Sequence, residues 1–218
     1  MIEAETRAAL ERYLVELHRA RVSVSSVTEP AAAWDVHVLD SLIALELDEV
    51  GEAHSIADIG SGGGFPGVAL AAALPEAGVD LIESVGRKCE FMRHALAAAG
   101  IGNARVIEAR AETWAAEPPP AETEGGGSPT DPSAGGGAGA CEVVTARAVG
   151  PLVTLAELAS PLLAEGGVLV AWKGVPDPED EERAARAAPL LAMQPERVVP
   201  VRPFEASRDR HLHLLRKT

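Results

Sequence analysis

SIADIGSGGGFPGVALAA, residues 55–72, is the stretch that decides the fold. An apolar run reaches Asp58, five glycines and one proline follow, and a second apolar run begins. A glycine cluster between a strand and a helix lets the backbone approach a ligand that a Cβ atom would exclude. It also leaves the first N–H groups of the helix free to bind an anionic or carboxylate group. The stretch therefore predicts a strand, a ligand-binding bend and a helix.

Short apolar runs alternate with helical patterns on either side of this bend. Further strands are predicted at 79–84, 104–109, 141–148 and 166–174. Helices are predicted at 68–74, 88–99, 152–163 and 182–193. This alternation is typical of a parallel sheet with helices on both faces. The last two strands, 196–204 and 210–217, have no helix between them, so they form a hairpin whose final strand runs antiparallel to its neighbours.

The chain divides into an N-terminal helical extension and a larger α/β domain. Residues 1–50 carry helical spacing, over 3–20 and 31–47, and we expect the main domain to occupy residues 51–218. Its sheet should have seven strands, mostly parallel, with a C-terminal antiparallel hairpin strand. Residues 117–140 are rich in Gly and Pro and nearly lack apolar side chains, which predicts a disordered insertion.

The charge of the chain is unevenly distributed. A formal net charge of −14 argues against a nucleic-acid partner, because phosphate binding needs local positive charge. Residues 202–217 offset this argument, since they carry five Arg or Lys against Glu205 and Asp209. Acidic residues concentrate elsewhere, as in 177–182. A solvated charged face is the alternative interpretation of either cluster.

Targeting signals and metal-ligand patterns are lacking in the sequence. The chain has no uncharged apolar run long enough for a transmembrane helix, and its N-terminus lacks the apolar centre of a secretory signal. Cys89 and Cys141 lie in apolar segments, which is typical of buried thiols in a reducing compartment. We therefore expect a cytoplasmic protein without membrane association. No metal is expected, because His, Cys and carboxylates show no ligand spacing.

Three features, each at the carboxyl end of a predicted strand, indicate a nucleoside site. The glycine bend, with Gly60 and Gly62, follows the first strand, and Glu83 ends the second strand, where it can accept hydrogen bonds from ribose hydroxyls. The polar turn Arg110-Ala111-Glu112 follows the third strand, where an adenine would lie.

The identity of the nucleoside stays open on spacing alone. Residues 62–67 match Gly-x-Gly-x-x-Gly, and Glu83 lies 21 residues after Gly62, as a dinucleotide site would also require. Two observations favour S-adenosylmethionine. The Asp58 carboxylate can meet a methionine ammonium group or fix the bend, and the C-terminal hairpin is typical of methyltransferase sheets.

Five stretches follow one another as they do in a known family. DIGSGGGFPG, LIESVGRKCEFM, EARAE, VVTARAVGPL and GGVLVAWKG resemble the bacterial small-subunit (16S) ribosomal RNA guanine-N7 methyltransferases, also called the glucose-inhibited division protein B family. The likeness covers about residues 34–112 and 141–174, with a weaker match in 210–217. It includes the upstream segment HVLDSL, which contains His37 and Asp40.

The resemblance implies a Rossmann-like, S-adenosylmethionine-dependent methyltransferase that acts on ribosomal RNA or the small ribosomal subunit. Separately from the resemblance, we expect a monomer. The resemblance also implies a site for the cofactor, with Glu83 as the acid on the ribose. The other members of this implied site are Gly60, Phe65, Ala111, Glu112 and Arg147. The segment LHRARVSVSSVT, with Thr28, departs from the family's Trp-Asn and Asn-Leu-Thr pattern, as does the Gly/Pro-rich insertion.

The residue types at the expected site favour guanine N7 as the methyl acceptor. An exocyclic amine usually needs an Asn-Pro-Pro-Tyr or Asp-Pro-Pro-Tyr turn, whereas the matching position here reads Thr145-Ala-Arg-Ala. A pyrimidine C5 acceptor needs a cysteine nucleophile, and neither cysteine is placed for that role. Guanine N7 carries an in-plane lone pair and needs no general base. Arg147 can hold guanine O6, a phosphate or the cofactor carboxylate.

His37, Lys173 and Arg210 are further candidates for substrate binding. Alternatively, His37 can bridge helices and Lys173 can be an exposed side chain. For an RNA substrate we expect a basic rim, made by Arg147, Lys173, Arg208, Arg210 and Lys217. Three other functions stay open from the residues: a methyltransferase for a small metabolite, a nicotinamide-dependent dehydrogenase and an assembly protein without turnover. An enclosed apolar pocket would favour the metabolite, and a basic mouth would favour RNA.

Overall fold

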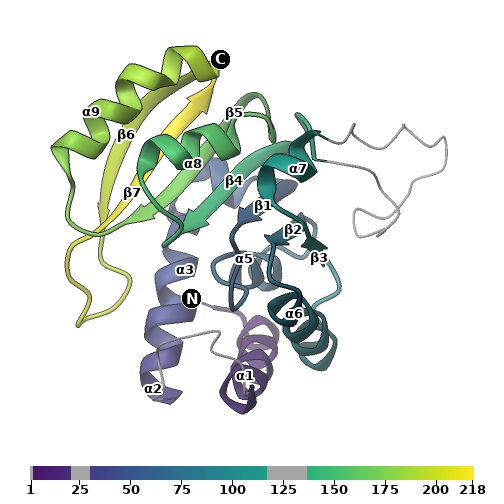
Figure 1. The fold of residues 1–218 in the computed structure, drawn as a ribbon. Helices are drawn as coiled ribbons and strands as arrows, with labels where there is room; N and C mark the ends of the chain where they lie inside the picture. Colours follow the sequence, from purple (N-terminus) through teal and green to yellow (C-terminus); the bar gives the residue numbers. More distant parts are fainter. Residues whose placement is uncertain (1, 21–29, 117–136) are drawn as a thin grey trace.

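A seven-stranded sheet organises the described part of the chain, which comprises residues 2–20, 30–116 and 137–218 of a computed structural model (Figure 1). The strands are β1 Ser55–Ile59, β2 Gly78–Glu83, β3 Ala104–Glu108, β4 Cys141–Arg147, β5 Leu163–Lys173, β6 Met193–Val201 and β7 Arg210–Lys217. Their order in the sheet is β3-β2-β1-β4-β5-β7-β6. The first five strands pair in parallel, and β7 pairs antiparallel with both β5 and β6. The expected mostly parallel sheet with a C-terminal hairpin is confirmed.

Helices cover both faces of the sheet (Figure 1). On one face lie α1 Ala4–Arg19, α5 Gly67–Ala73 and α6 Gly86–Ala99. On the other face lie α7 Ala111–Ala116, α8 Leu152–Ala159 and α9 Pro178–Ala187. Alternate strand residues enter the two cores, since Ile56 packs in the first and Ala57 in the second. Burial on both faces explains why the central strands are nearly continuous apolar runs.

Several predicted boundaries are wrong for identifiable local reasons. The helix expected over 182–193 begins at Pro178, because the Asp177 side chain caps it by accepting a hydrogen bond from the Glu179 N–H. That helix gives way to the 3-10 turn η3, Ala188–Leu191, which contains Pro189. The segment after β3 is the short helix α7, where the sequence predicted only a turn.

The helix expected over 31–47 is a chain of short helical pieces. They are α2 Pro30–Ala33, the π-helix η1 Trp34–Leu39, α3 Asp40–Leu42, the 3-10 turn η2 Ile43–Glu46 and then α4 Asp48–Gly51. A π-helix widens the backbone by one residue per turn and is frequent at functional sites. Here η1 carries the segment before the glycine bend that the sequence analysis singled out.

The N-terminal helix α1 packs against α5 and α6 and shares their core. The Thr6 hydroxyl donates to the carbonyl of Ala72, and Arg12 donates to the carbonyl of Ala99. The fully buried Tyr13 donates to the carbonyl of Gly63 at 3.0 Å. Helix α1 therefore supports the glycine bend directly.

Most of the expected disordered insertion, residues 117–136, lies outside the described residues, as does Thr28. Residues 137–140, which end that insertion, form a turn. The Gly137 N–H donates to the carbonyl of Trp114, and a Cβ atom at Gly137 would lie 2.6 Å from the indole nitrogen of Trp114. The packing of this turn against α7 therefore fixes the entry to β4.

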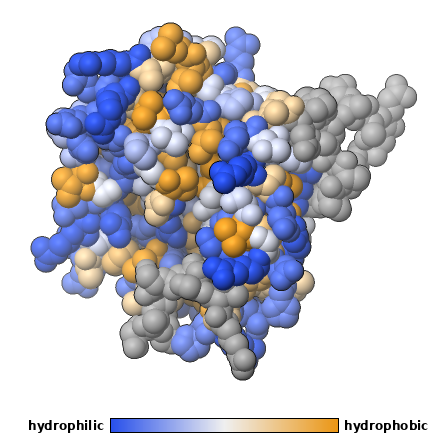
Figure 2. Space-filling view, in the orientation of Figure 1, coloured by the Kyte–Doolittle hydropathy of each residue, from blue (hydrophilic) through white to orange (hydrophobic). Residues whose placement is uncertain are grey.

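Hydrophilic and apolar residues alternate over the visible face of the molecule (Figure 2). None of the described helices has the length and apolar character needed to cross a bilayer. Cys89 and Cys141 are both buried and free, as the sequence predicted.

A glycine substitution tests the contact between α1 and the bend. Gly64 has φ +98°, and a Cβ atom there would clash with the Tyr13 hydroxyl and with Val68. Gly64→Ala should therefore lower the free energy of unfolding by about 3 kcal/mol or more, from backbone strain and overpacking together. Urea denaturation followed by circular dichroism measures this change.

Gly166→Ala is the matched control, because Gly166 also has a positive φ, +80°, but a Cβ atom there meets nothing within 4 Å. The free energy of unfolding of Gly166→Ala should fall only by the backbone contribution, about 1–2 kcal/mol. Equal losses for the two variants would show that Tyr13 does not constrain the bend.

Candidate cofactor and substrate site

An open pocket of about 530 Å³ lies at the carboxyl ends of β1 and β4. We call it the bend pocket. Its lining residues are Leu17, Val36, His37, Asp40, Gly60, Ser61, Gly62, Gly63, Phe65, Lys88, Arg147, Ala148, Trp172, Lys173, Gly174 and Arg210. Because β1 has β2 on one side and β4 on the other, this is the point where the strand order reverses, and ligands bind there in α/β sheets.

The glycines of the bend serve two purposes. Gly60 and Gly62 have φ values of +66° and +58°, which other residues rarely adopt. Gly64 and Gly67 leave room for neighbours, since a Cβ atom at Gly67 would clash with Leu81 and lie 2.8 Å from the Cβ of Asp58. The side-chain-free backbone therefore both turns sharply and packs closely.

The buried side chain of Asp58 fixes the shape of the glycine bend through hydrogen bonds. Its carboxylate accepts hydrogen bonds from the Gly67 N–H at 3.3 Å and from the Thr145 hydroxyl at 2.8 Å. Ser61 donates to its main-chain carbonyl. Burial raises the pKa of Asp58 to about 6, against hydrogen bonds that lower it. Asp58 does not line the bend pocket, so these contacts favour the loop-fixing role over contact with an ammonium group.

Glu83 lies beside the bend. One of its carboxylate oxygens accepts from the Gly62 N–H at 3.1 Å, and the other accepts from the Val85 N–H at 2.9 Å. The ammonium of Lys88 is 3.5 Å away. The structure therefore brings the second-strand acid and the glycine bend together, as the sequence predicted.

Ala111 and Glu112 open α7, which follows β3 on the same edge of the sheet. Ala111 is buried, and Glu112 is exposed and pairs with Arg110 at 3.7 Å. These residues are not in the lining of the bend pocket. They lie two strands away from β1, on the side where Glu83 ends β2.

Arg147 is held by the N-terminal segment. Its Nη1 donates to the Asp40 carboxylate at 2.8 Å, to the carbonyl of Val36 at 3.1 Å and to the Ser41 hydroxyl at 3.3 Å. Its Nε and Nη2 donate to no group in the described residues. The guanidinium is thus fixed through one nitrogen, and it presents further donors at the wall of the bend pocket.

Asp40 joins three strands to the N-terminal segment. Besides Arg147 of β4, its carboxylate accepts from Nε of Arg210 on β7 at 3.0 Å. Its main-chain carbonyl accepts from the indole N–H of Trp172 on β5 at 2.7 Å. Asp40 was not predicted as a site residue, and no local pattern could show partners 107 and 170 residues away.

His37 and Phe65 stack with ring centroids 5.2 Å apart and an interplanar angle of 17°. Tyr13 also contacts Phe65, edge-on, with ring centroids 5.6 Å apart. Burial and the nearby Arg147 lower the pKa of His37 to about 4, although Asp40 acts in the opposite direction. His37 is therefore neutral at pH 7 and forms part of an aromatic wall of the pocket.

Two further cations of the predicted basic rim, Lys173 and Lys217, lie at opposite ends of the sheet. Lys173 lines the bend pocket, and its ammonium pairs with Asp180 at 2.9 Å and donates to the carbonyl of Gly150. Lys217 is misplaced in the predicted rim. It ends β7, which runs antiparallel, so it lies at the opposite end of the sheet, where its ammonium donates to the Ser160 hydroxyl.

Lys88 and Ala148 are among the lining residues that were not singled out in the sequence. Lys88 follows Glu83 by five residues, a spacing that could have indicated a pair at the start of α6. Ala148 has φ +59°, which the sequence does not reveal for a non-glycine residue. In the described part of the chain, no group of three or more His, Cys, Asp or Glu is arranged to hold a metal ion.

The sheet order, the C-terminal hairpin and the bend pocket define the class of Rossmann-like methyltransferases. The Methanococcus jannaschii fibrillarin pre-rRNA processing protein shares this fold with a TM-score of 0.55 at 16% identity, over 78% of this chain and 69% of its own. Mitomycin 7-O-methyltransferase MmcR has a TM-score of 0.59 at 12% identity, over 99% of this chain and 69% of its own.

The chain belongs to the rRNA small subunit methyltransferase G family, whose model matches residues 6–212. A relative named ribosomal RNA small subunit methyltransferase G, from Sorangium cellulosum, is 35% identical over 88% of this chain and 73% of its own. Relatives of the same name from Rubrobacter xylanophilus and Myxococcus xanthus are 37% and 38% identical, over 84% and 86% of this chain. The chain spans 64% and 77% of those two relatives. The family expected from the sequence is confirmed.

The shifted pKa of His37 predicts a specific dependence of stability on pH. The folded state disfavours the proton, because the pKa is about 4 in the fold and 6.5 ordinarily. The contribution of neutral His37 is therefore complete above pH 6.5 and is lost as pH falls toward 4. In urea denaturation, the difference in unfolding free energy between wild type and His37→Gln should shrink over this range.

A difference that stays constant over this pH range would contradict the buried, neutral histidine.

Proposed function

We propose that this protein transfers a methyl group from S-adenosylmethionine to N7 of a guanine in small-subunit ribosomal RNA. The observation that carries the proposal is the charge of the bend pocket. Its lining contains four cationic side chains, Lys88, Arg147, Lys173 and Arg210, which pair with three carboxylates, Asp40, Glu83 and Asp180. In a chain of net charge −14, this local excess of positive charge suits a polyanionic substrate.

The residues around the bend fit the cofactor. The backbone at Gly60 and Gly62 leaves space where side chains would stand, and a Cβ atom at Gly62 would meet only the Gly60 carbonyl, at 3.7 Å. Glu83 would hold the ribose hydroxyls, and Ala111 and Glu112 would lie near the adenine. When bound, S-adenosylmethionine supplies an electrophilic methyl group on a sulfonium.

The protein's part in this transfer is to align the acceptor and exclude water. Guanine N7 is a nucleophile without proton removal, so the site needs no general base. The pocket agrees with this: His37 is stacked on Phe65, and Asp40 is committed to two arginines. The free donors of Arg147 can take guanine O6, which leaves the N7 lone pair free to attack the methyl group, or they can take a phosphate.

The alternative substrate, a small metabolite, is less well supported. Pockets for such ligands are usually concave, mostly apolar and able to bury most of the ligand. The bend pocket is open and lined by charged groups. Family membership favours rRNA methylation over both the dehydrogenase and the metabolite enzyme. A cytoplasmic, monomeric enzyme remains our expectation.

Cofactor binding is tested by calorimetry with S-adenosylhomocysteine. Wild type should bind it and should not bind NAD. Glu83→Gln should weaken binding by about 10-fold to 100-fold, which corresponds to the loss of a hydrogen bond to a charged group. Glu108→Gln is a matched control, because Glu108 lies next to Glu83 in the sheet register but pairs with Arg93 outside the pocket. Equal affinities for both variants would remove Glu83 from the cofactor site.

Activity is tested by mass spectrometry of small-subunit rRNA from cells with and without the gene. One guanine should carry one additional methyl group, at N7, only when the gene is present. Purified Arg147→Ala should methylate unmodified rRNA about 100-fold more slowly than wild type, as expected for a lost electrostatic contact. Arg183→Ala, on the exposed face of α9, should keep full activity.

An unchanged rate for a folded Arg147→Ala would show that this residue is not in the site. Binding of rRNA by wild type without any methyl transfer would instead support the assembly protein.

A further inference from the structure

Most cations of this protein are neutralised within the fold. Thirteen of the described Lys and Arg side chains lie within 4.0 Å of a carboxylate. Five of the described ones do not: Arg12, Arg87, Arg202, Arg208 and Lys217. Such thorough pairing is expected when acids outnumber bases by 33 to 19. The exceptions therefore need an explanation.

Two of the five exceptions have roles inside the fold. Arg12 donates through two nitrogens to the carbonyl of Ala99, and Lys217 donates to the Ser160 hydroxyl. The other three, Arg87, Arg202 and Arg208, are exposed. Within the described residues, Arg202 donates to the main-chain carbonyl of Glu205 and to no other group. These three we call the rim arginines.

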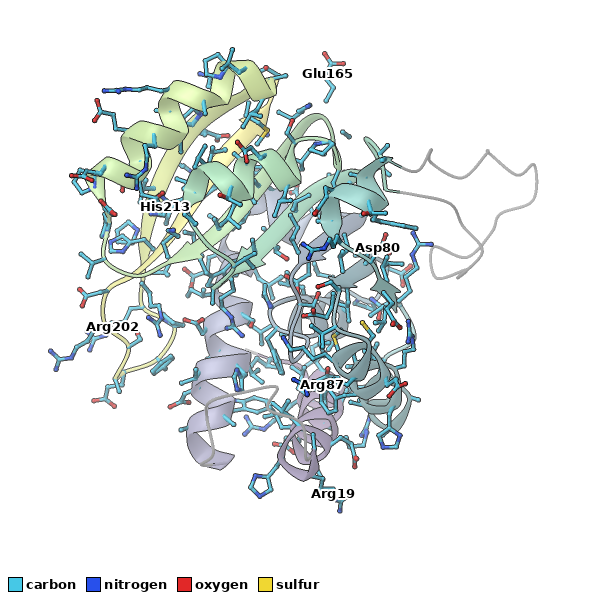
Figure 3. All side chains as sticks on the ribbon, viewed as in Figure 1. Arg19, Asp80, Arg87, Glu165, Arg202 and His213 are labelled. Atoms are coloured by element: carbon cyan, nitrogen blue, oxygen red, sulfur yellow. The ribbon has the colours of Figure 1, made fainter. Side chains whose placement is uncertain are left out.

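All three rim arginines lie next to the bend pocket in the chain. Arg87 is in the first turn of α6, directly before the lining residue Lys88. Arg208 lies two residues before the lining residue Arg210, and Arg202 begins the same loop between β6 and β7. Figure 3 labels Arg87 beside α6 and Arg202 at the outer edge of that loop.

The carboxylates nearest to this region are largely committed. Asp40 pairs with Arg147 and Arg210, and Glu83 pairs with Lys88. Glu205 and Asp209 are exposed in the loop and make no ion pair with a described residue. The field at the mouth of the bend pocket is therefore set mainly by cations, although the loop carries these two acids.

The sheet order places the rim arginines on two sides of the pocket. Helix α6 follows β2, and the loop precedes β7, and these strands are four steps apart in the sheet. At about 4.8 Å per step, the two sides are about 19 Å apart. A stacked strand with one phosphate per about 3.4 Å would pass five or six phosphates over that distance.

We propose that the rim arginines bind phosphates of the substrate RNA strand on both sides of the bend pocket. The inference rests on the proposed function and adds the path of the RNA: the strand crosses from α6 to the loop between β6 and β7. A guanine in the middle of this path must leave the base stack to enter the pocket. Phosphates on both sides hold the strand in register while it does so.

The salt dependence of RNA binding tests this path. The probe is a fluorescent single-stranded RNA of about twelve nucleotides with a central guanine, long enough to span both sides. Each phosphate contact on single strands contributes about 0.7 to the slope of log affinity against log salt concentration. Arg87→Gln, Arg202→Gln and Arg208→Gln should each reduce the slope by about 0.7, and the triple variant by about 2.

A second triple variant, Arg93→Gln with Arg183→Gln and Arg186→Gln, is the matched control. These arginines are also exposed, they pair with carboxylates, and Arg93 shares helix α6 with Arg87. The control makes the same change in net charge, and its slope should equal that of wild type. Equal slopes for the two triple variants would overturn the inference.

Methyl transfer separates this inference from the proposed function. With rRNA as substrate, the rim triple variant should raise KM at least 10-fold and leave kcat within 2-fold of wild type. Its affinity for S-adenosylhomocysteine should not change. Wild type that neither binds the cofactor product nor transfers methyl would refute the function itself. Full activity of wild type with unchanged KM and slope in every rim variant would refute only the rim arginines.

Discussion

The carboxylate of Asp58 is the interaction on which the site depends. It lies one residue before the end of β1 and accepts from the first turn of α5 and from Thr145 of β4, so one buried group fixes three elements around the glycine bend. A side chain of this kind is stable in the interior only when its oxygens are hydrogen-bonded. The close approach of Gly67, which any Cβ atom would prevent, is what makes those bonds possible. Chain direction, bend shape and pocket position all follow from this arrangement.

The N-terminal segment forms part of the site. The helical pieces from Trp34 to Leu42 supply Asp40, which holds arginines from β4 and β7, while Tyr13 of α1 reaches the bend from the other side. The pocket therefore has walls from distant parts of the chain, and its cations are oriented before any ligand arrives. Preorganised donors of this kind need no rearrangement when charge develops in a reaction.

The strands, the mostly parallel sheet with its hairpin and the glycine bend could be predicted from the sequence, because each depends on a local pattern of residues. Apolar runs bounded by glycine identify β1 and β5, and the missing helix before residue 210 identifies the hairpin. The partners of Asp40 could not be predicted, since they come from strands far along the chain. Lys217 lies away from the predicted rim because β7 runs antiparallel to β5, which puts its last residue at the end of the sheet opposite the bend pocket.

The aromatic row that runs from Tyr13 through Phe65 to His37 links the first helix to the pocket wall. Phe, Trp and Tyr make up only 3% of the chain, yet three of them, Tyr13, Phe65 and Phe91, meet at this one place. A genetic screen for strains that lose the enzyme's product would accordingly recover inactivating changes in the first twenty codons. Truncated gene copies that begin after that helix would encode a protein whose glycine bend has lost the Tyr13 contact.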